Sequence, residues 1–297
     1  MARLYISPVC LVLMVISGAG IGPGFAMEFP FGSKRENAEK GIVEIELDSP
    51  HQDGPTRVEV LLPDRPEPGK KYPVLYILPV GGAAKRAFGD GLQEARQADL
   101  ANKYGVICVQ PYFSLVPWLG NHATDPKIQQ ERHLLETVVP MIDATFPTQA
   151  DPEGRWLIGF SKGGWAAITQ LLRNPETFGY AAAWDVPFML TGDNSGPNWG
   201  PMGLKRNFGT KEAMQQSLPT KLAEQNADWL KERPRLVIGV GEFWKGPSTK
   251  YHQFLEQRGI PHAYRDDLVL KHRWDTGWFE PIAVELIGTA RAPGSAP

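Results

Sequence analysis

Residues 156–172 read WLIGFSKGGWAAITQLL and join a short apolar run, a serine between glycines and an amphipathic stretch. The centre, Gly159-Phe160-Ser161-Lys162-Gly163, matches the pattern G-x-S-x-G. There a serine stands on a tight turn between a strand and a helix, so its neighbours must be small. The turn exposes the hydroxyl beside the unpaired amides of a helix N-terminus, which can stabilise an oxyanion. Ser161 is the candidate nucleophile; the alternative is an ordinary glycine-rich turn.

Strand and helix patterns alternate on both sides of this segment. Unbroken apolar runs predict strands buried on both faces at 74–78, 106–109 and 156–158. Further strands are predicted at 42–47, 57–62, 180–184, 235–240 and 263–270, and helices at 92–104, 127–145, 163–173, 251–257 and 281–286. About eight strands separated by helices predict an α/β fold with a mostly parallel sheet and helices on both faces.

The composition of the 297 residues is typical of a globular protein, with 42% hydrophobic and 22% charged residues. Neither an internal repeat nor a linker divides the chain, so one domain is expected at 27–290. Residues 191–233 lack a strand pattern and are rich in Gly, Pro, Asn and Trp, which predicts a small cap. The small and polar residues 291–297 predict a disordered tail.

The N-terminus has the organisation of a secretory signal peptide. Arg3 is followed by an apolar run centred on 9–16, and Gly24-Phe25-Ala26 has the small-x-small form of a cleavage site. The apolar run is shorter than the about 20 residues that span a bilayer, so cleavage after Ala26 is preferred over an uncleaved anchor. Residues 1–26 therefore predict a secreted or periplasmic protein without a membrane span.

Charge and cysteine content argue against two other classes of protein. The formal net charge is −2, so no basic surplus favours nucleic acid as a partner. Only two cysteines are present, Cys10 and Cys108, and no Cys/His spacing suggests a metal site. Cys108 lies in the apolar run 106–109, which predicts a buried thiol.

A serine nucleophile needs a histidine base and an acid, in the chain order Ser, acid, His for this arrangement. Of six histidines, His272 alone follows the last predicted strand, on a loop flanked by aromatic residues. The acid is expected after strand 235–240, where Glu242 is the only carboxylate. Asp185, which ends strand 180–184, is the runner-up, and Asp267 is third.

Backbone amides and tryptophans are expected around the serine. The amide of Lys162 and that of Val80 or Gly81, in the loop after strand 74–78, are the candidate oxyanion donors. A pocket for the acyl or alcohol group is expected from four partly exposed tryptophans in loops near Ser161. These are Trp118, Trp199, Trp244 and Trp274, with core packing as the alternative for each.

These segments resemble α/β-hydrolases of the putative esterase family, which includes esterase D, feruloyl esterases and antigen 85-like enzymes. The resemblance rests on 159–163, on Leu172-Arg173-Asn174-Pro175-Glu176-Thr177-Phe178, and on His272 followed by Trp274 and Trp278. It implies ester or thioester hydrolysis or acyl transfer by Ser161 and His272 without metal or cofactor. Two positions depart from the family pattern: Pro79-Val80 replaces the usual His before the glycines, and the usual Asp after the seventh strand is absent.

The preferred hypothesis is a secreted serine esterase that acts on a small-molecule or glycan-linked carboxylic ester through an acyl-enzyme on Ser161. The alternative is a catalytically degenerate hydrolase fold that binds a glycan or a protein. Peptidase activity is a weaker third interpretation.

Overall fold

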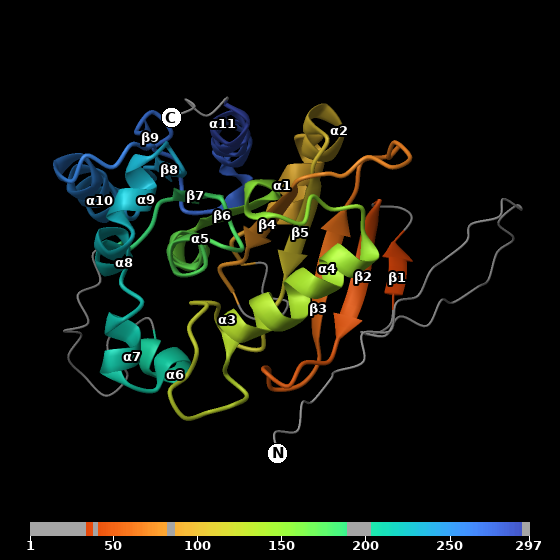
Figure 1. Cartoon of the computed structure of the whole chain (residues 1–297), viewed down its shortest axis with the longest axis horizontal. Coiled ribbons are helices and arrows are strands. Elements are labelled where there is room, and N and C mark those ends of the chain that lie inside the picture. Colours follow the sequence, from red (N-terminus) through yellow and green to blue (C-terminus); the bar gives the residue numbers. More distant parts are fainter. Residues whose placement is uncertain (1–33, 38–40, 82–86, 189–202, 293–297) are drawn as a thin grey trace, which may run out of the picture.

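The chain forms one nine-stranded sheet in the computed structural model, which describes residues 34–37, 41–81, 87–188 and 203–292. The strand order is β1-β2-β3-β5-β4-β6-β7-β8-β9 (Figure 1). The strands are β1 (Lys34–Asn37), β2 (Ile42–Leu47), β3 (Thr56–Leu61), β4 (Val74–Leu78), β5 (Ile107–Pro111), β6 (Arg155–Phe160), β7 (Tyr180–Trp184), β8 (Leu236–Gly239) and β9 (Ala263–Arg265). β1, β2, β3 and β5 pair antiparallel, and all pairs from β5 to β9 are parallel.

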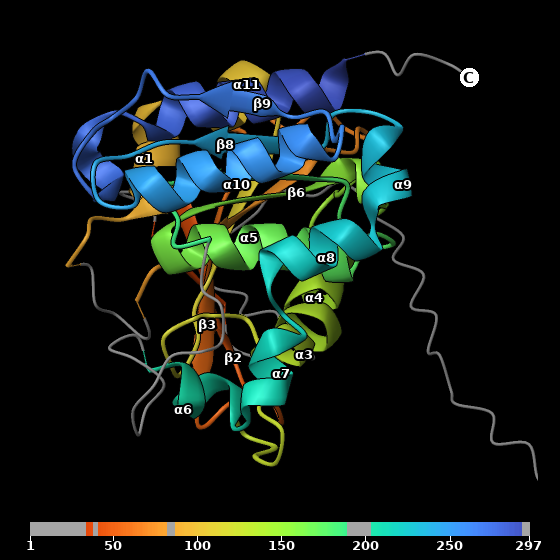
Figure 2. The ribbon, with the colours of Figure 1, turned by 90° about the vertical axis from the view of Figure 1, so that its left-hand side faces the viewer.

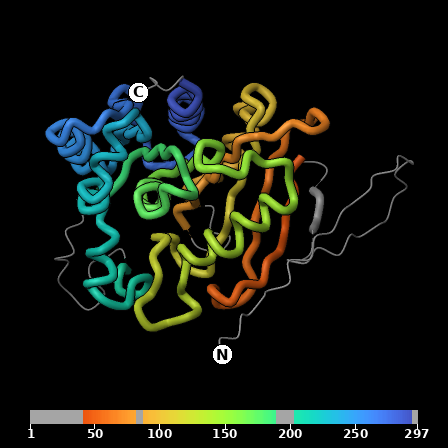
Figure 3. Tube along the Cα trace, viewed as in Figure 1, coloured from red at the N-terminus to blue at the C-terminus, as the bar shows by residue number. Residues whose placement is uncertain are grey.

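The parallel strands are buried on both faces, as their unbroken apolar runs predict. Along β4, Leu75 and Ile77 belong to the core on one face, and Tyr76 and Leu78 to the core on the other. The chain trace runs from the antiparallel edge, built by the N-terminal strands, to the parallel edge, built by the C-terminal ones (Figure 3). The carboxyl ends of the parallel strands therefore meet along one edge of the sheet, where open α/β sheets bind ligands.

Helices cover both faces of this sheet (Figure 2). The core on one face is closed by α3 (Gln130–His133), η1 (Leu134–Val138), α4 (Val139–Thr145), α5 (Ser161–Arg173), α6 (Leu204–Phe208), α7 (Lys211–Gln215), α8 (Pro219–Gln225), α9 (Ala227–Lys231) and α10 (Lys245–Gln257). The other core is closed by α1 (Gly91–Gln97), α2 (Leu100–Tyr104) and α11 (Phe279–Arg291). Two short 3₁₀ turns, η2 (Pro152–Gly154) and η3 (Trp274–Thr276), complete the described elements.

The α/β-hydrolase fold, with a mostly parallel sheet between helical layers, is confirmed. All eight expected strands are present, although the one expected at 263–270 ends at Arg265, and β1 is an additional strand at the antiparallel edge. The expected helix 92–104 is two helices, because Asp99 between them adopts a left-handed conformation with φ of 55°. The last helix reaches Arg291, the first residue of the expected tail.

Several expectations fall on residues outside the described ranges. These are the signal peptide 1–26, the end of the tail at 293–297 and the first part of the cap at 191–202. Helices α6 to α9 occupy the remainder of the 191–233 segment, and α8 packs against α5. Within the described residues, no helix is both long and apolar enough to cross a membrane.

Candidate active site

Ser161 stands at the junction of β6 and α5 on a strained turn. Its φ is 53°, one of only four positive values among the non-glycine residues that the structure describes. A Cβ on Gly159 would lie 2.4 Å from the carbonyl carbon of Gly163, and a Cβ on Gly163 would lie 2.2 Å from the carbonyl oxygen of Leu78. Both positions therefore require glycine, and the tight turn predicted from the sequence is confirmed.

Asp185 occupies the equivalent position on the neighbouring strand. It directly follows β7, has a φ of 49° and is fully buried. Its Oδ2 lies 2.6 Å from Nδ1 of His272. The backbone amides of Phe243 and Trp244 donate to the same carboxylate, at 3.2 and 2.5 Å. The carboxylate therefore accepts two backbone hydrogen bonds and is also the acceptor for the N–H at His272 Nδ1.

The preference for Glu242 as the partner of His272 is wrong, because the runner-up Asp185 makes that contact. The Glu242 side chain is exposed, and its amide donates to the carbonyl oxygen of Leu270 at 3.0 Å. The loop after β8 offers backbone amides in place of a carboxylate. Its Gly241 lies against Asp185, since a Cβ there would meet Cβ and Cγ of Asp185 at 2.4 Å. Asp267, the third candidate, is exposed and paired with Arg265 at 2.7 Å.

His272 lies on the loop after β9, and aromatic rings and backbone bonds hold it beside the elbow. Its ring packs edge-on against Phe160, the residue before Ser161, with centroids 4.9 Å apart. Two residues further along the chain, the amide of Trp274 donates to the carbonyl oxygen of Phe88 at 2.7 Å. The structure therefore bonds His272 to Asp185 and packs it against Phe160, the residue before Ser161, which is an arrangement suited to a Ser-His-Asp triad.

The three candidate oxyanion residues lie around the elbow. The contact between Gly163 and the end of β4 places the following residues, Val80 and Gly81, next to the first turn of α5. Lys162 belongs to that turn and is half-buried, and burial lowers the pKa of its ammonium group. Val80 is buried, and with Gly81 it lines a small cavity that also touches Trp274.

The four tryptophans expected around the serine fall into different environments. Trp118 is not exposed: it is fully buried and packs edge-on against Trp165 in the core, 5.3 Å between centroids. Trp274 is also buried, yet its ring packs against Phe160 at 4.9 Å. Trp244 is half-buried beside Asp185. Trp199 lies outside the described residues. The alternative of core packing therefore holds for Trp118, whose ring lies against Trp165 of α5. Trp244 and Trp274 adjoin the site.

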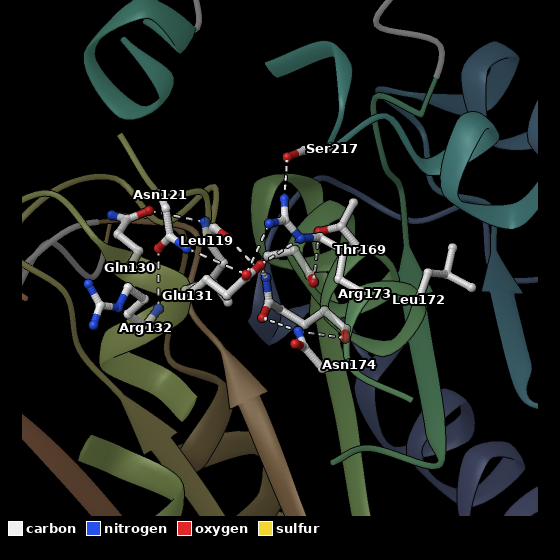
Figure 4. Close-up of polar contacts among 12 residues, drawn as sticks. Leu119, Asn121, Gln130, Glu131, Arg132, Thr169, Leu172, Arg173, Asn174 and Ser217 are labelled. Atoms are coloured by element: carbon white, nitrogen blue, oxygen red, sulfur yellow. Dashed lines mark hydrogen bonds and ion pairs between the residues drawn. The ribbon is translucent and has the colours of Figure 1, made fainter. Parts of the chain in front are cut away.

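A buried ion pair fixes the far end of the elbow helix (Figure 4). Glu131 and Arg173 lie 2.8 Å apart, and Gln170 donates to the same carboxylate at 3.0 Å. Burial raises the pKa of Glu131. Arg173 also donates to Ser217, at 2.7 Å, and so links α5 to the segment after α7. The network anchors the helix that carries Ser161 to α3 and to the segment after α7.

Two aromatic residues near His272 have no counterpart among the sequence predictions. Phe243 lies 5.1 Å from the His272 ring, and Phe88 lies 6.1 Å from it, between ring centroids. In the sequence, the adjacent aromatic residues Phe243-Trp244 in the loop after the penultimate strand could have indicated an aromatic residue near the site. No group of three His, Cys, Asp or Glu suited to a metal ion occurs in the described part of the chain.

Comparison with known families identifies relatives of this arrangement. A family model described as "Putative esterase" matches residues 49–241, more than half of the chain. Esterase Rv1288 of Mycobacterium tuberculosis is 32% identical over 159 residues, which cover 51% of this chain and 30% of that protein. The chain thus matches under a third of the length of this curated relative.

Solved structures share the fold at low sequence identity. A ferulic acid esterase is 18% identical with a TM-score of 0.65, covering 84% of this chain and 97% of that one. FphF, a fluorophosphonate-binding serine hydrolase of Staphylococcus aureus, is 17% identical with a TM-score of 0.67, covering 84% and 98%. Both likenesses concern the fold.

Proposed function

The chain belongs to the Putative esterase family, and we propose that it is a secreted serine hydrolase that cleaves carboxylic esters through an acyl-enzyme on Ser161. The observation that carries the proposal is the 2.6 Å bond between His272 and Asp185 beside the strained elbow. A buried carboxylate on Nδ1 keeps that nitrogen protonated, so Nε2 of His272 carries the lone pair that can accept the serine proton.

These positions support the following sequence of steps. His272 Nε2 takes the proton from Ser161 Oγ as the oxygen attacks the ester carbonyl carbon. The resulting oxyanion is stabilised by the amide of Lys162 and that of Val80 or Gly81. The histidine then donates its proton to the departing alcohol. Water, deprotonated by the same histidine, then attacks the acyl carbon. The bond from that carbon to Ser161 Oγ breaks, the acid leaves, and the histidine returns the proton to Oγ.

Secretion rests on residues 1–26, whose basic, apolar and small-residue regions follow the order of a signal peptide. Expression of the full chain with N-terminal sequencing of the exported product tests this part. Cleavage after Ala26 supports it, and a cytoplasmic full-length product contradicts it.

The substrate class is a small-molecule or glycan-linked ester.

A covalent serine probe separates the enzyme from the alternative, a degenerate fold that only binds a glycan or protein. A fluorophosphonate is expected to label the wild type at Ser161 and to leave Ser161→Ala unlabelled. A panel of 4-nitrophenyl esters of increasing acyl length then measures turnover. Absence of both labelling and ester hydrolysis in the folded wild type would reject the proposal and favour the binding protein.

A further inference from the structure

Exposed aromatic rings lie beside His272, the candidate general base and acid. Across the described residues, only three large hydrophobic side chains are strongly exposed: Phe88 (39%), Phe243 (67%) and Val269 (41%). Two of these three touch the His272 ring, at 6.1 and 5.1 Å between centroids. Burial of an apolar ring stabilises a protein, and an exposed ring forgoes that stabilisation. Two such rings beside one functional histidine therefore point to a ligand.

Both rings are held by the backbone bonds that build the site. The amide of Phe243 donates to Asp185 at 3.2 Å, and its ring packs edge-on against Trp244 at 5.0 Å. The carbonyl oxygen of Phe88 accepts from the Trp274 amide at 2.7 Å, and its ring packs against Phe160 at 6.4 Å. The rings therefore keep their positions relative to His272, and a ligand that contacts them loses little conformational freedom of the protein.

The chemistry of His272 decides which half of an ester reaches these rings. The histidine delivers its proton to the oxygen of the departing alcohol, so that oxygen must come within hydrogen-bond reach of Nε2. The remainder of the alcohol therefore lies close to the imidazole. Phe88 and Phe243 are the exposed rings beside this imidazole, so we place the alcohol against them.

We propose that Phe88 and Phe243 form the alcohol subsite and select esters whose alcohol carries an apolar aromatic ring. The proposal rests on the esterase function proposed above. Aromatic rings pair edge to face or offset, with centroids 4.5–7 Å apart, and two exposed Phe rings beside His272 can pair with a ligand ring in this way. The nearby charged residues Arg273 and Asp275 are bonded to each other at 2.7 Å. Their charges offset each other, so the apolar rings govern which alcohol is selected.

Two butyrate esters, of ethanol and of benzyl alcohol, test the subsite. They form the same butyryl-enzyme, so any influence of the alcohol falls on acylation and is read from kcat/KM. Phe243→Ala and Phe88→Ala are each expected to lower the benzyl-to-ethyl ratio of kcat/KM about 5-fold, because an aromatic contact contributes about 1 kcal/mol. The Phe→Leu variants, which keep apolar bulk without a ring, should fall between.

Val269→Ala serves as the matched control, since it removes the third exposed apolar side chain, which carries no aromatic ring. It should keep the wild-type ratio, and fluorophosphonate labelling confirms that each variant retains a folded site. A ratio unchanged in both Phe variants would overturn the proposal. So would an equal loss on both esters, which would assign the rings to the acyl group. Failure of the wild type to hydrolyse even ethyl butyrate would instead reject the esterase function.

Discussion

Ser161 and Asp185 leave neighbouring parallel strands at the same level. The residues before them, Phe160 and Trp184, are partners in the register of β6 and β7. Both then adopt left-handed backbone conformations, with φ of 53° and 49°. Such a conformation costs about 1–2 kcal/mol for a non-glycine residue and persists where the surroundings enforce it. Two strained backbone positions lie at one edge, with His272 bonded to Asp185 and packed on Phe160 beside Ser161, and they are the strongest structural evidence for catalysis.

Asp185→Asn should reduce ester turnover about 10⁴-fold, as removal of the orienting acid does in serine proteases. An amide no longer stabilises the imidazolium that forms when Ser161 attacks. Glu242→Gln is the matched control, because Glu242 is a carboxylate on the adjoining loop whose side chain is exposed. Steady-state kinetics on a 4-nitrophenyl ester measure both. If Glu242→Gln abolished turnover while Asp185→Asn stayed active, Glu242 in the loop after β8 would be the acid of the triad.

Ser161→Ala and His272→Ala should each lower turnover by several orders of magnitude, and the double variant should be little worse. Groups that act as one unit give losses that do not add, because the remaining member cannot act alone. The kcat values of the three variants on one ester provide the comparison. Additive losses, or a tenfold effect of either single change, would show that the two residues act separately.

Gly241→Ala should strongly impair turnover by displacing the acid. Its new Cβ would approach Cβ and Cγ of Asp185 to 2.4 Å, so the carboxylate must move away from His272. Gly246→Ala is the control, since nothing lies within 4 Å of a Cβ at that position in α10. Thermal unfolding of both variants separates loss of activity from loss of fold. Equal activities of the two variants would contradict the close packing of Gly241 on Asp185.

His133 should make the protein less stable below neutral pH. Burial lowers its pKa to about 4, with a smaller effect of His51, from an ordinary value of 6.5. Between these values the unfolded chain binds a proton that the folded chain does not, so the free energy of unfolding decreases as pH falls. The contribution is about 2 kcal/mol between pH 7 and pH 5. Urea unfolding at both pH values should show a smaller difference for His133→Gln; an identical difference would show that His133 is not the cause.

Cys108 should resist thiol reagents while the protein is folded. The thiol is fully buried in β5, and burial raises its pKa to about 12. Thiolate is the reacting form. At pH 8 the folded protein therefore keeps the thiol both out of reach of the reagent and protonated. In a Cys10→Ser chain, Ellman's reagent should detect no thiol in buffer and one in guanidinium chloride. Rapid labelling of the native chain would show that β5 opens.

Much of the architecture could be predicted because local patterns report burial. The apolar runs of β4, β5 and β6 marked strands covered on both faces, and the small residues around Ser161 marked the elbow. The ends of elements were less predictable. The helix expected at 92–104 breaks at Asp99, whose left-handed conformation no periodicity reveals.

The sequence by itself determined the fold class, the strained elbow at Ser161 and the position of His272 on the loop after the last strand, because each depends on residues close together in the chain. Only the tertiary structure decided which carboxylate meets His272, that Trp118 is buried and that Phe88 and Phe243 stand exposed beside the histidine. β7 lies between β6 and β8, and its register with β6 places Asp185 next to the elbow. Such a contact depends on the order and register of strands far apart in sequence, which no local pattern encodes.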